Sequence, residues 1–412
     1  MLRRSLLGRL LLLALLGGRL AACGPGAAPA APTITFGASI SITGKTAKEG
    51  EYALDGYQMF MDATNAAGGI TVAGTAYKLR LRYYDDQSDP ELTTRLYEKL
   101  VTEDQVDFLL GPYGSGPTAA AAAVAEKYGI PLVSGHGSAG SIYDQGYRYI
   151  LSIQTPARNY LSGVLEAILA VDPQLKTVAI LVEDESFSRE VGQGAVEYAQ
   201  ARGLEVVANE LYPIDTQDLG PQLRAIKLRA PDVLLGAGHL QDALLIVRQA
   251  KELELTPAAL GLSVGPSSPQ FRDTLRKDAD YIFGSTQWTT SLPYRGDDPW
   301  QTPAAFAAAF RAAYPNYKSV PYQVAESAAA LIVFQAGLEK AGTLDREVVR
   351  DTIAGLSLMT FFGPIRFDQR GVNSAKPMVV EQLQTDGQKY TVFPLAVAEK
   401  PMQYPMPPWD RR

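Results

Sequence analysis

Two loops of this chain combine glycines with serines, and loops of this kind can bind an anion. Residues 111–117 read Gly-Pro-Tyr-Gly-Ser-Gly-Pro, and residues 134–138 read Ser-Gly-His-Gly-Ser. Glycine lets the backbone approach a ligand closely, and free N–H groups at the start of a helix favour a carboxylate. Ser115 and Ser138 could add hydroxyl donors, although serine also caps ordinary helices. Because the loops follow successive predicted strands, we favour a carboxylate site over two ordinary turns.

Three acidic residues follow a later apolar run, at Glu183, Asp184 and Glu185. Such a group can bind an ammonium ion or a metal. More often it matches the positive end of a helix, and we favour this second interpretation. Phe187 follows directly and either faces a cleft or joins the core. His239 follows a Gly-Ala-Gly turn at the end of another apolar run, which favours a functional position.

Little in the sequence favours catalysis. The chain holds two histidines and one cysteine. His136 and His239 have no partner at metal-ligand spacing, and no Gly-x-Ser-x-Gly turn follows a predicted strand. The Gly-Lys-Thr at 44–46 lacks the first glycine of a phosphate-binding loop, where Ser39 stands instead. We therefore expect no enzyme, no cofactor and no metal, with an exported hydrolase as a minor alternative.

The first residues have the pattern of a secretion signal. Arg3 and Arg4 precede a short apolar run at 10–16, which is too short to span a membrane. The following Leu-Ala-Ala-Cys resembles a bacterial lipobox, which implies that residues 1–22 are removed and that Cys23 is lipidated. The alternative is a free or buried thiol in an uncleaved leader. Cys23 and the Gly/Ala/Pro segment that follows it to residue 32 would then be an anchor and tether.

The charge and the length narrow the class of protein. The signal segment carries four arginines and no acids, so its removal takes the formal net charge from −6 to −10. An acidic chain without a basic stripe argues against nucleic acid as a partner. The remaining length favours two domains over one. We expect an exported monomer that a lipid holds to the outer face of the cell membrane.

Short apolar runs alternate with helical patterns along most of the chain. This alternation predicts parallel sheets with right-handed crossovers. The predicted strands lie at 33–42, 78–84, 106–110, 130–133, 177–182, 204–211, 232–235 and 281–283. Three helical stretches then follow at 303–314, 321–341 and 345–355. Three edge strands close the pattern at 365–367, 378–384 and 390–393.

Several motifs, taken in order, resemble the leucine/isoleucine/valine-type solute-binding proteins of bacterial ABC transporters. The resemblance covers residues 33–394. Its carriers are Thr43 and Gly44 after the first strand, Asn-Ala-Ala-Gly-Gly-Ile at 65–70, Asp85 and Asp86 before Asp-Pro at 89–90, Gly-Pro-Tyr-Gly-Ser at 111–115, Ile-Pro-Leu-Val-Ser at 130–134, and Gly-Pro-Ile-Arg-Phe-Asp at 363–368 before Gly371.

The resemblance implies a class I periplasmic-binding-protein fold, an α/β architecture of two lobes with three hinge crossings. Each lobe would be a mostly parallel sheet flanked by helices. The N-terminal lobe would comprise 33–155 and 286–363. The C-terminal lobe would comprise 156–285 and 364–395, followed by a tail at 396–412. Such proteins close on a solute and deliver it to an ABC transporter permease.

The resemblance also implies a set of site residues. The two Gly/Ser loops would hold the carboxylate and ammonium of an amino acid, an aromatic side chain would stack over it, and an acid would line the side-chain pocket. The positions that match are Ser115 and Gly116, Gly137 and Ser138, Phe187 and His239, and Glu49.

One position departs from the family pattern. Amino-acid binders of this kind place an acid where Ser263 stands here, and a buried ammonium without a counter-charge is costly. Either Glu49 or Asp184 replaces that acid, or the ligand lacks an α-ammonium. We expect a branched-chain or other apolar amino acid. The alternatives are an amine-free aromatic or aliphatic carboxylate, an amide or a short peptide, or a sensory receptor built on the same lobes.

Overall fold

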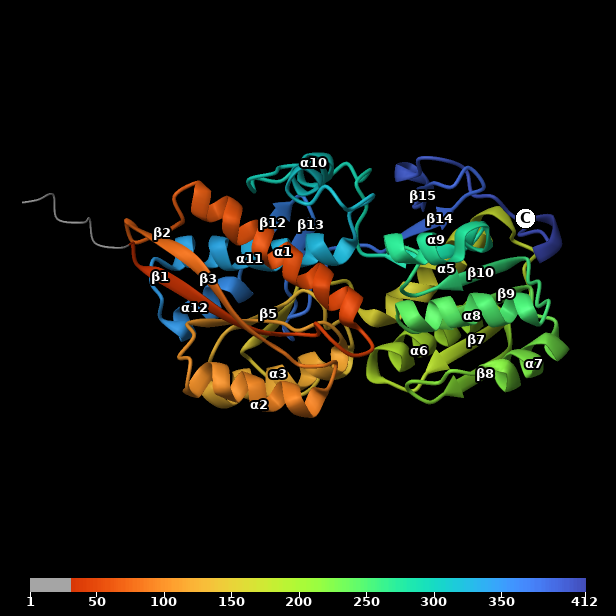
Figure 1. The fold of residues 1–412 in the computed structure, drawn as a ribbon, viewed down its shortest axis with the longest axis horizontal. Coiled ribbons are helices and arrows are strands. Elements are labelled where there is room, and N and C mark those ends of the chain that lie inside the picture. Colours follow the sequence, from red (N-terminus) through yellow and green to blue (C-terminus); the bar gives the residue numbers. More distant parts are fainter. Residues whose placement is uncertain (1–30) are drawn as a thin grey trace, which may run out of the picture. The chain divides into compact units, whose positions relative to one another are not determined.

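The computed structural model describes residues 31–412, and Pro32–Arg412 form one compact unit. Two sheets organise this unit (Figure 1), and we call each sheet with its helices a lobe. Residues 1–30, with the predicted signal peptide and Cys23, lie outside the described residues. Within the described part of the chain, no helix is long and apolar enough to cross a membrane.

The first lobe is built on a six-stranded sheet in the order β2-β3-β1-β4-β5-β6. Only β2 runs antiparallel to its neighbour. β1 is buried along almost its whole length, as expected of a strand that is covered on both faces. The strands are β1 (Thr33–Ile40), β2 (Ile70–Val72), β3 (Thr75–Asp85), β4 (Phe108–Leu110), β5 (Leu132–Ser134) and β6 (Ile150–Ser152).

Helices cover both faces of the first sheet. α1 and α11 pack together on one face, and α2 and α3 pack together on the other (Figure 1). The side chain of Asp89 caps α2 by accepting from the Glu91 N–H. The helices of this lobe are α1 (Ala47–Ala66), α2 (Pro90–Thr102), α3 (Ser115–Tyr128), α4 (Gly140–Tyr143), α10 (Pro303–Ala313), α11 (Tyr322–Ala341) and α12 (Arg346–Ala354).

The second lobe is built on a seven-stranded sheet in the order β15-β14-β11-β10-β9-β7-β8. Its last two strands join antiparallel to an otherwise parallel sheet. The strands are β7 (Thr177–Glu183), β8 (Glu205–Tyr212), β9 (Val233–Ala237), β10 (Ala259–Leu262), β11 (Phe283–Thr286), β14 (Val379–Leu383) and β15 (Lys389–Phe393).

Two separate cores flank the second sheet. One core includes α5 and α6, and the other includes α7, α8 and α9. The helices are α5 (Tyr160–Val171), α6 (Ser186–Ala201), α7 (Gly220–Arg229), α8 (Leu240–Glu252) and α9 (Pro269–Leu275). Short 3₁₀ turns occupy η1 (Ala157–Asn159), η2 (Arg276–Ala279), η3 (Leu395–Val397) and η4 (Trp409–Arg411).

The predicted fold class is confirmed, and the structure adds elements that the sequence pattern did not predict. These are β2, β6 and β12 (Ser357–Thr360), which are short; β12 pairs with β13 (Gly363–Arg366), which overlaps the strand predicted at 365–367. Their few residues give too little periodicity to recognise. Ile365 belongs to the core of the first lobe, and Val372 bridges to Ser152 of β6. The chain therefore changes lobe between Val372 and Val379, later than predicted.

The C-terminal segment is part of the second lobe and not a free tail. The backbone N–H of Met406 donates to the carbonyl of Ala258 at 2.8 Å, and the Met406 side chain is buried. The indole N–H of Trp409 donates to the carbonyl of Leu255 at 2.8 Å. These contacts place residues after 396 along the second sheet and its helices.

One buried side chain from each of the three crossings meets at the hinge. The Gln287 amide donates to the Thr155 carbonyl at 2.9 Å, and its oxygen accepts the Thr155 N–H at 3.1 Å. The Thr155 hydroxyl donates to the carbonyl of Lys376 at 2.9 Å, while the Lys376 ammonium donates to the Gln287 side chain at 3.0 Å. All three residues are at most 5% exposed, so the hinge is a tied, buried junction.

Candidate interlobe binding site

A small, partly open cavity lies where the two lobes meet. Its lining residues come from loops that follow parallel strands and from the first turns of helices, where α/β sheets place their ligands. Six of the lining side chains are aromatic, and a backbone turn, two serines, an amide and a valine complete the wall. The residues are Tyr113, Gly114, Ser115, His136, Ser138, Gln154, Tyr160, Phe187, His239, Val264 and Tyr322.

A second and larger cavity lies between α9, the loop before α11 and the β14–β15 hairpin. Its lining is rich in charged side chains such as Arg272, Lys318 and Lys389. Residues that follow β10 and β11 also reach this larger cavity. The smaller cavity, however, is the one lined by the two Gly/Ser loops after β4 and β5, and we infer that it is the ligand site.

The first wall of the cavity comes from the two Gly/Ser loops. Gly114 has φ = 89°, a conformation that favours glycine, and it directs the chain into α3 at Ser115. The Ser115 hydroxyl accepts the N–H of Ala139 at 3.2 Å, which ties the first loop to the second. A side chain at Gly137 would lie 2.4 Å from a Thr118 methyl carbon. Glycine there lets the second loop pack against α3.

Aromatic rings form a continuous wall that crosses from one lobe to the other. The ring centroids of Tyr113 and His239 lie 5.6 Å apart, those of His239 and Phe187 lie 5.3 Å apart, and those of Phe187 and Tyr160 lie 5.2 Å apart. The ring centroid of His136 lies 5.7 Å from that of Tyr113. The Tyr113 hydroxyl and His239 Nδ1 are 3.2 Å apart. Such a wall can hold a flat or apolar group.

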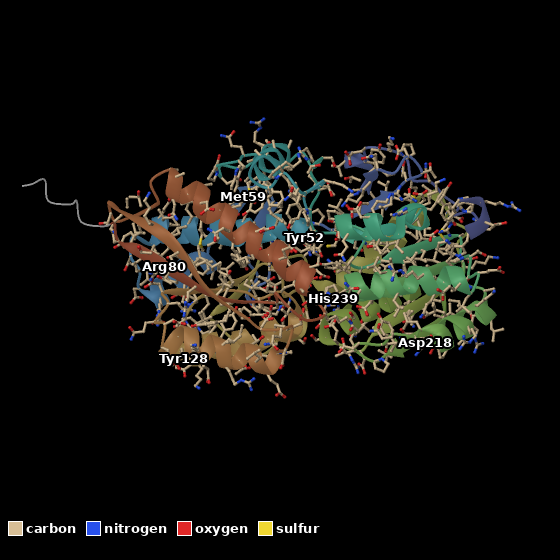
Figure 2. All side chains as sticks on the ribbon, in the orientation of Figure 1. Tyr52, Met59, Arg80, Tyr128, Asp218 and His239 are labelled. Carbon is tan, nitrogen blue, oxygen red and sulfur yellow. The ribbon has the colours of Figure 1, made fainter. Side chains whose placement is uncertain are left out.

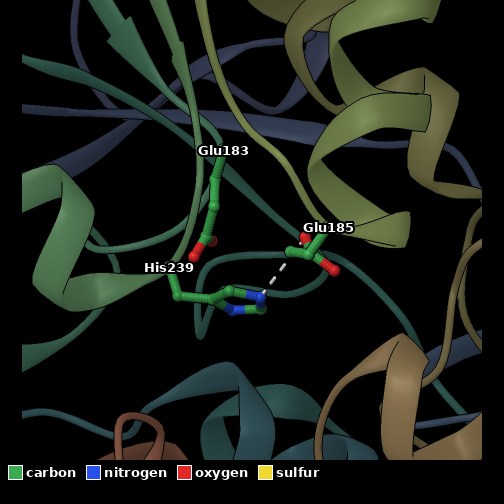
Figure 3. Close-up of side chains that lie close together, drawn as sticks. All are labelled: Glu183, Glu185 and His239. Atoms are coloured by element: carbon green, nitrogen blue, oxygen red, sulfur yellow. Dashed lines mark ion pairs between the residues drawn. The ribbon is translucent and has the colours of Figure 1, made fainter. Parts of the chain in front are cut away.

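The acidic side chains of Glu183 and Glu185 lie next to His239 (Figure 3). His239 Nε2 is 3.7 Å from Glu185 Oε1. Burial acts to lower the pKa of His239, but the hydrogen bond and charge of Glu185 outweigh it and raise the pKa to about 9. Burial acts to raise the pKa of Glu185, but His239 and Ser188 bring it to about 2. Burial raises the pKa of Glu183 to about 7.

Side chains of the first lobe reach these acids across the cleft. The Lys45 ammonium contacts Glu183 and donates to Asp242 at 3.1 Å. Glu49 Oε1 accepts the N–H of Leu240 at 3.2 Å. Figure 2 shows His239 and Tyr52 near the boundary between the lobes, and the Tyr52 hydroxyl lies 3.0 Å from Ser268 Oγ. These contacts define a closed arrangement of the two lobes.

A family comparison decides the class of this protein. Residues 33–388 match the family model of the periplasmic binding proteins. The chain belongs to this periplasmic binding protein family. Membership implies an extracytoplasmic location, and the family is one of solute receptors and not of enzymes. The predicted resemblance is confirmed.

Curated relatives of this binding protein cover nearly its whole length. Leu/Ile/Val-binding protein homolog 7 of Brucella abortus (strain 2308) is 25% identical over 402 residues, which are 93% of this chain and 97% of the relative. Leu/Ile/Val-binding protein homolog 8 of Brucella suis biovar 1 is 26% identical over 419 residues, covering 97% and 99%. The similarity thus extends over nearly the whole length of these relatives.

Solved structures share the two-lobed fold. The branched-chain amino acid transporter substrate-binding protein LivJ of Streptococcus pneumoniae, in complex with isoleucine, has a TM-score of 0.77 at 21% identity and covers 90% of this chain and 100% of its own. A solute-binding protein of an ABC transporter from R. palustris, in complex with benzoate, has a TM-score of 0.75 at 18% identity, covering 90% and 97%. At these identities the likeness concerns the fold alone.

Four of the predicted site residues of the binding protein line the cavity, namely Ser115, Ser138, Phe187 and His239. Gly116 and Gly137 lie beside it in the same two loops without lining it. Glu49 is buried behind the wall, next to the N-terminus of α8. The structure therefore brings only some of the predicted site residues together at the cavity.

Two predicted residues are placed away from the cavity. Asp184 is exposed and pairs with Arg189 on the surface of α6. The Ser263 hydroxyl is buried and bonds both backbone groups of Gly238, accepting at 3.0 Å and donating at 2.8 Å. The next residue, Val264, lines the cavity instead. A side chain after β10 therefore reaches the ligand site, but from the position following the one predicted.

Sequence reasoning missed several lining residues. Tyr113 and His136 lie inside the two predicted Gly/Ser loops, but only the serines and glycines of those loops were predicted as site residues. His136 is fixed by the Ser327 hydroxyl at 2.8 Å and by Glu326 at 3.3 Å. Tyr160 and Tyr322 each begin a largely apolar helix, and nothing in the local sequence distinguishes them from core residues.

Proposed function

We propose that this periplasmic binding protein is the substrate-binding component of an ABC importer. It captures a small carboxylate-bearing solute between its lobes and delivers it to a membrane permease. Two findings support this proposal. The curated relatives are named as Leu/Ile/Val-binding proteins, and two structures of the same fold hold isoleucine and benzoate, both carboxylates. The cavity offers Ser115 and Ser138 beside helix and loop N–H groups, which suit a carboxylate.

An amine-free aromatic carboxylate fits the lining best, and the make-up of the wall is the observation that carries this choice. Six of its side chains are aromatic, and Val264 is its aliphatic member. No Asp or Glu is among the residues that line this cavity in the described part of the chain. A solute with a ring and a carboxylate would therefore find partners for both groups, whereas an ammonium group would find no direct counter-charge.

An apolar amino acid is the second candidate, and one feature favours it. Glu49 and Glu183 lie close to His239, and each has one buried carboxyl oxygen without a hydrogen-bond partner in the part of the chain that the structure describes. A modest shift of His239 would bring an ammonium group within reach of these oxygens. Glu49 was already predicted for this role, whereas Asp184 is turned to solvent.

We also propose that the protein is held at the membrane through a lipid on Cys23. The Gly/Ala/Pro segment that follows Cys23 supports this assignment, because it cannot build a core and would serve as a tether. Mass spectrometry of the protein isolated from membranes tests it. A diacylglycerol-modified N-terminal cysteine is the expected result, and an unmodified chain that begins at Met1 would contradict it.

Thermal unfolding of the purified protein with a panel of solutes tests the choice of substrate. The panel contains benzoate, isoleucine, the deaminated analogue of isoleucine, and the amides of benzoate and of isoleucine. A solute at 100 times its dissociation constant adds about 2.7 kcal/mol of stability. Stabilisation by benzoate is expected. Stabilisation by isoleucine but not by its deaminated analogue would establish the second candidate, and no response to any carboxylate would contradict the proposal.

A further inference from the structure

We propose that Glu183, Glu185 and His239 form a binding site for a divalent transition-metal ion on the second lobe. Each of these side chains offers one ligand atom, and the three atoms all lie within 4.8 Å of one another. Figure 3 shows the side chains converging from separate segments of the chain. The sequence analysis predicted no metal site, because His239 is far along the chain from Glu183 and Glu185.

The parallel sheet explains why these residues meet. β7 and β9 are neighbours, with Val182 opposite Ala237. Glu183 ends β7, Glu185 is the N-cap of α6, and His239 is the N-cap of α8. All three stand on the rigid edge of one lobe. The three ligand residues therefore all belong to the second lobe.

One donor oxygen of the cluster is free, whereas both oxygens of Glu185 accept N–H groups of α6. The Glu183 side chain is 1% exposed, and its Oε2 has no hydrogen-bond partner among residues 31–412. His239 Nε2 faces Glu185 Oε1 at 3.7 Å, while Nδ1 is held by the Tyr113 hydroxyl at 3.2 Å. A partner on the second ring nitrogen is typical of metal-bound histidine, because it fixes the ring. A separation of 3.7 Å also suits two ligands that each lie about 2.0–2.2 Å from one ion.

The local charge favours a cation. Four carboxyl groups gather here against two basic side chains, namely Glu49, Glu183, Glu185 and Asp242 against Lys45 and His239. A buried carboxyl oxygen without a partner is costly. A divalent ion would satisfy the free oxygen of Glu183 and match the excess of carboxyl groups over basic side chains.

The ligand set selects the class of metal. One imidazole nitrogen with two carboxylate oxygens suits Zn²⁺, Mn²⁺ or Fe²⁺, whereas Ca²⁺ and Mg²⁺ prefer oxygen ligands alone. By the general order of affinities, Zn²⁺ should bind more tightly than Mn²⁺. Lys45 of the first lobe contacts the same Glu183 when the lobes close, so the ion and the lysine would compete for it.

Isothermal titration of chelator-treated protein with Zn²⁺, Mn²⁺, Ca²⁺ and Mg²⁺ tests the site. We expect one Zn²⁺ per chain, weaker Mn²⁺ binding, and no response to Ca²⁺ or Mg²⁺ at the same concentrations. Glu183→Gln and His239→Gln should each weaken Zn²⁺ binding at least about 10-fold. Glu197→Gln, which removes an exposed carboxylate of α6, is the matched control and should change nothing.

A further variant separates a metal site from a merely structural cluster. Lys45→Met removes the competing cation without removing a ligand, so Zn²⁺ affinity should rise. Co²⁺ should give the visible absorption of a four- or five-coordinate ion, and Glu183→Gln should alter it. No Zn²⁺ binding, or equal binding by Glu183→Gln and wild type, would overturn the proposal. Loss of isoleucine binding in Glu183→Gln with Zn²⁺ binding intact would do so as well, assigning the cluster to a solute ammonium.

Discussion

The two lobes present different chemistry to the cleft between them. The first lobe contributes glycine-rich turns, the hydroxyls of Ser115 and Ser138, and the rings of Tyr113 and Tyr322. The second lobe contributes Phe187 and His239, with a group of buried carboxyls directly behind them. One wall thus suits an anion through hydrogen bonds, and the other combines an apolar surface with ionisable groups. A solute with a carboxylate at one end and a ring at the other would satisfy both walls.

The largest expected effect comes from the two serine hydroxyls that the first lobe presents to the cavity. Replacing Ser115 and Ser138 together with alanine removes two hydrogen-bond donors from a charged ligand group. Each such bond is worth about 1.5–3 kcal/mol, so the dissociation constant of the stabilising solute should rise at least about 100-fold. Isothermal titration measures this. Ser162→Ala, on α5 away from the cavity, is the control, and an unchanged affinity in the double variant would remove these serines from the site.

A carboxylate introduced into the second wall should reverse the preference of the cavity. Val264 lines the cavity, and Val264→Asp would place an acid beside the solute. Like charges in close contact cost several kcal/mol, so binding of amine-free carboxylates should fall about 10-fold or more, and amino acids should gain relative to them. Competition titrations with benzoate and isoleucine measure the shift. Ser263→Asp tests the residue next to it, whose hydroxyl points at Gly238 and not at the cavity.

A smaller effect is expected from the contact that joins the two walls. Lys45→Met removes the ammonium group that pairs with Glu183 and Asp242 when the lobes are closed. The variant should therefore destabilise the closed state more than the open state, in which water can solvate both carboxyls. The closed population should fall, and solute affinity should weaken by up to about 10-fold. Small-angle scattering without and with solute reports the balance. Equal scattering curves for the variant and the wild type would show that this ion pair does not hold the lobes together.

The last expected effect concerns the pH dependence of the hinge and not solute binding. Burial lowers the pKa of Lys376 to about 7, partly opposed by the charge of Glu326. The unfolded chain keeps this lysine protonated up to about pH 10.5, so between pH 7 and 10.5 the unfolded state binds more protons. The folded state should therefore gain stability with rising pH, by at most about 1.4 kcal/mol per unit from this group. Denaturant unfolding of wild type and Lys376→Met at about pH 7 and about pH 9 isolates the slope, which the variant should lack.

The sequence predicted most of the fold because its signals are local. Apolar runs bounded by turns marked the strands, and the loops after β4 and β5 identified Ser115 and Ser138. Glu183, Asp184 and Glu185 show the limit of such local signals. Successive residues at the end of a strand point to opposite sides, and the sequence does not say that Glu183 turns to the cleft while Asp184 turns to solvent. Tyr322 reaches the cavity only because α11, remote in sequence, packs beside α1.

We propose above all that the interlobe cavity recognises a carboxylate next to a ring. Isothermal titration with benzoate and benzamide tests it most directly, since the two solutes share their ring and differ in the charged group. We predict that benzoate binds, that benzamide binds at least about 100-fold more weakly, and that the Ser115→Ala/Ser138→Ala variant loses this difference. Equal binding of both solutes to the wild type, or no binding of benzoate at all, would contradict it.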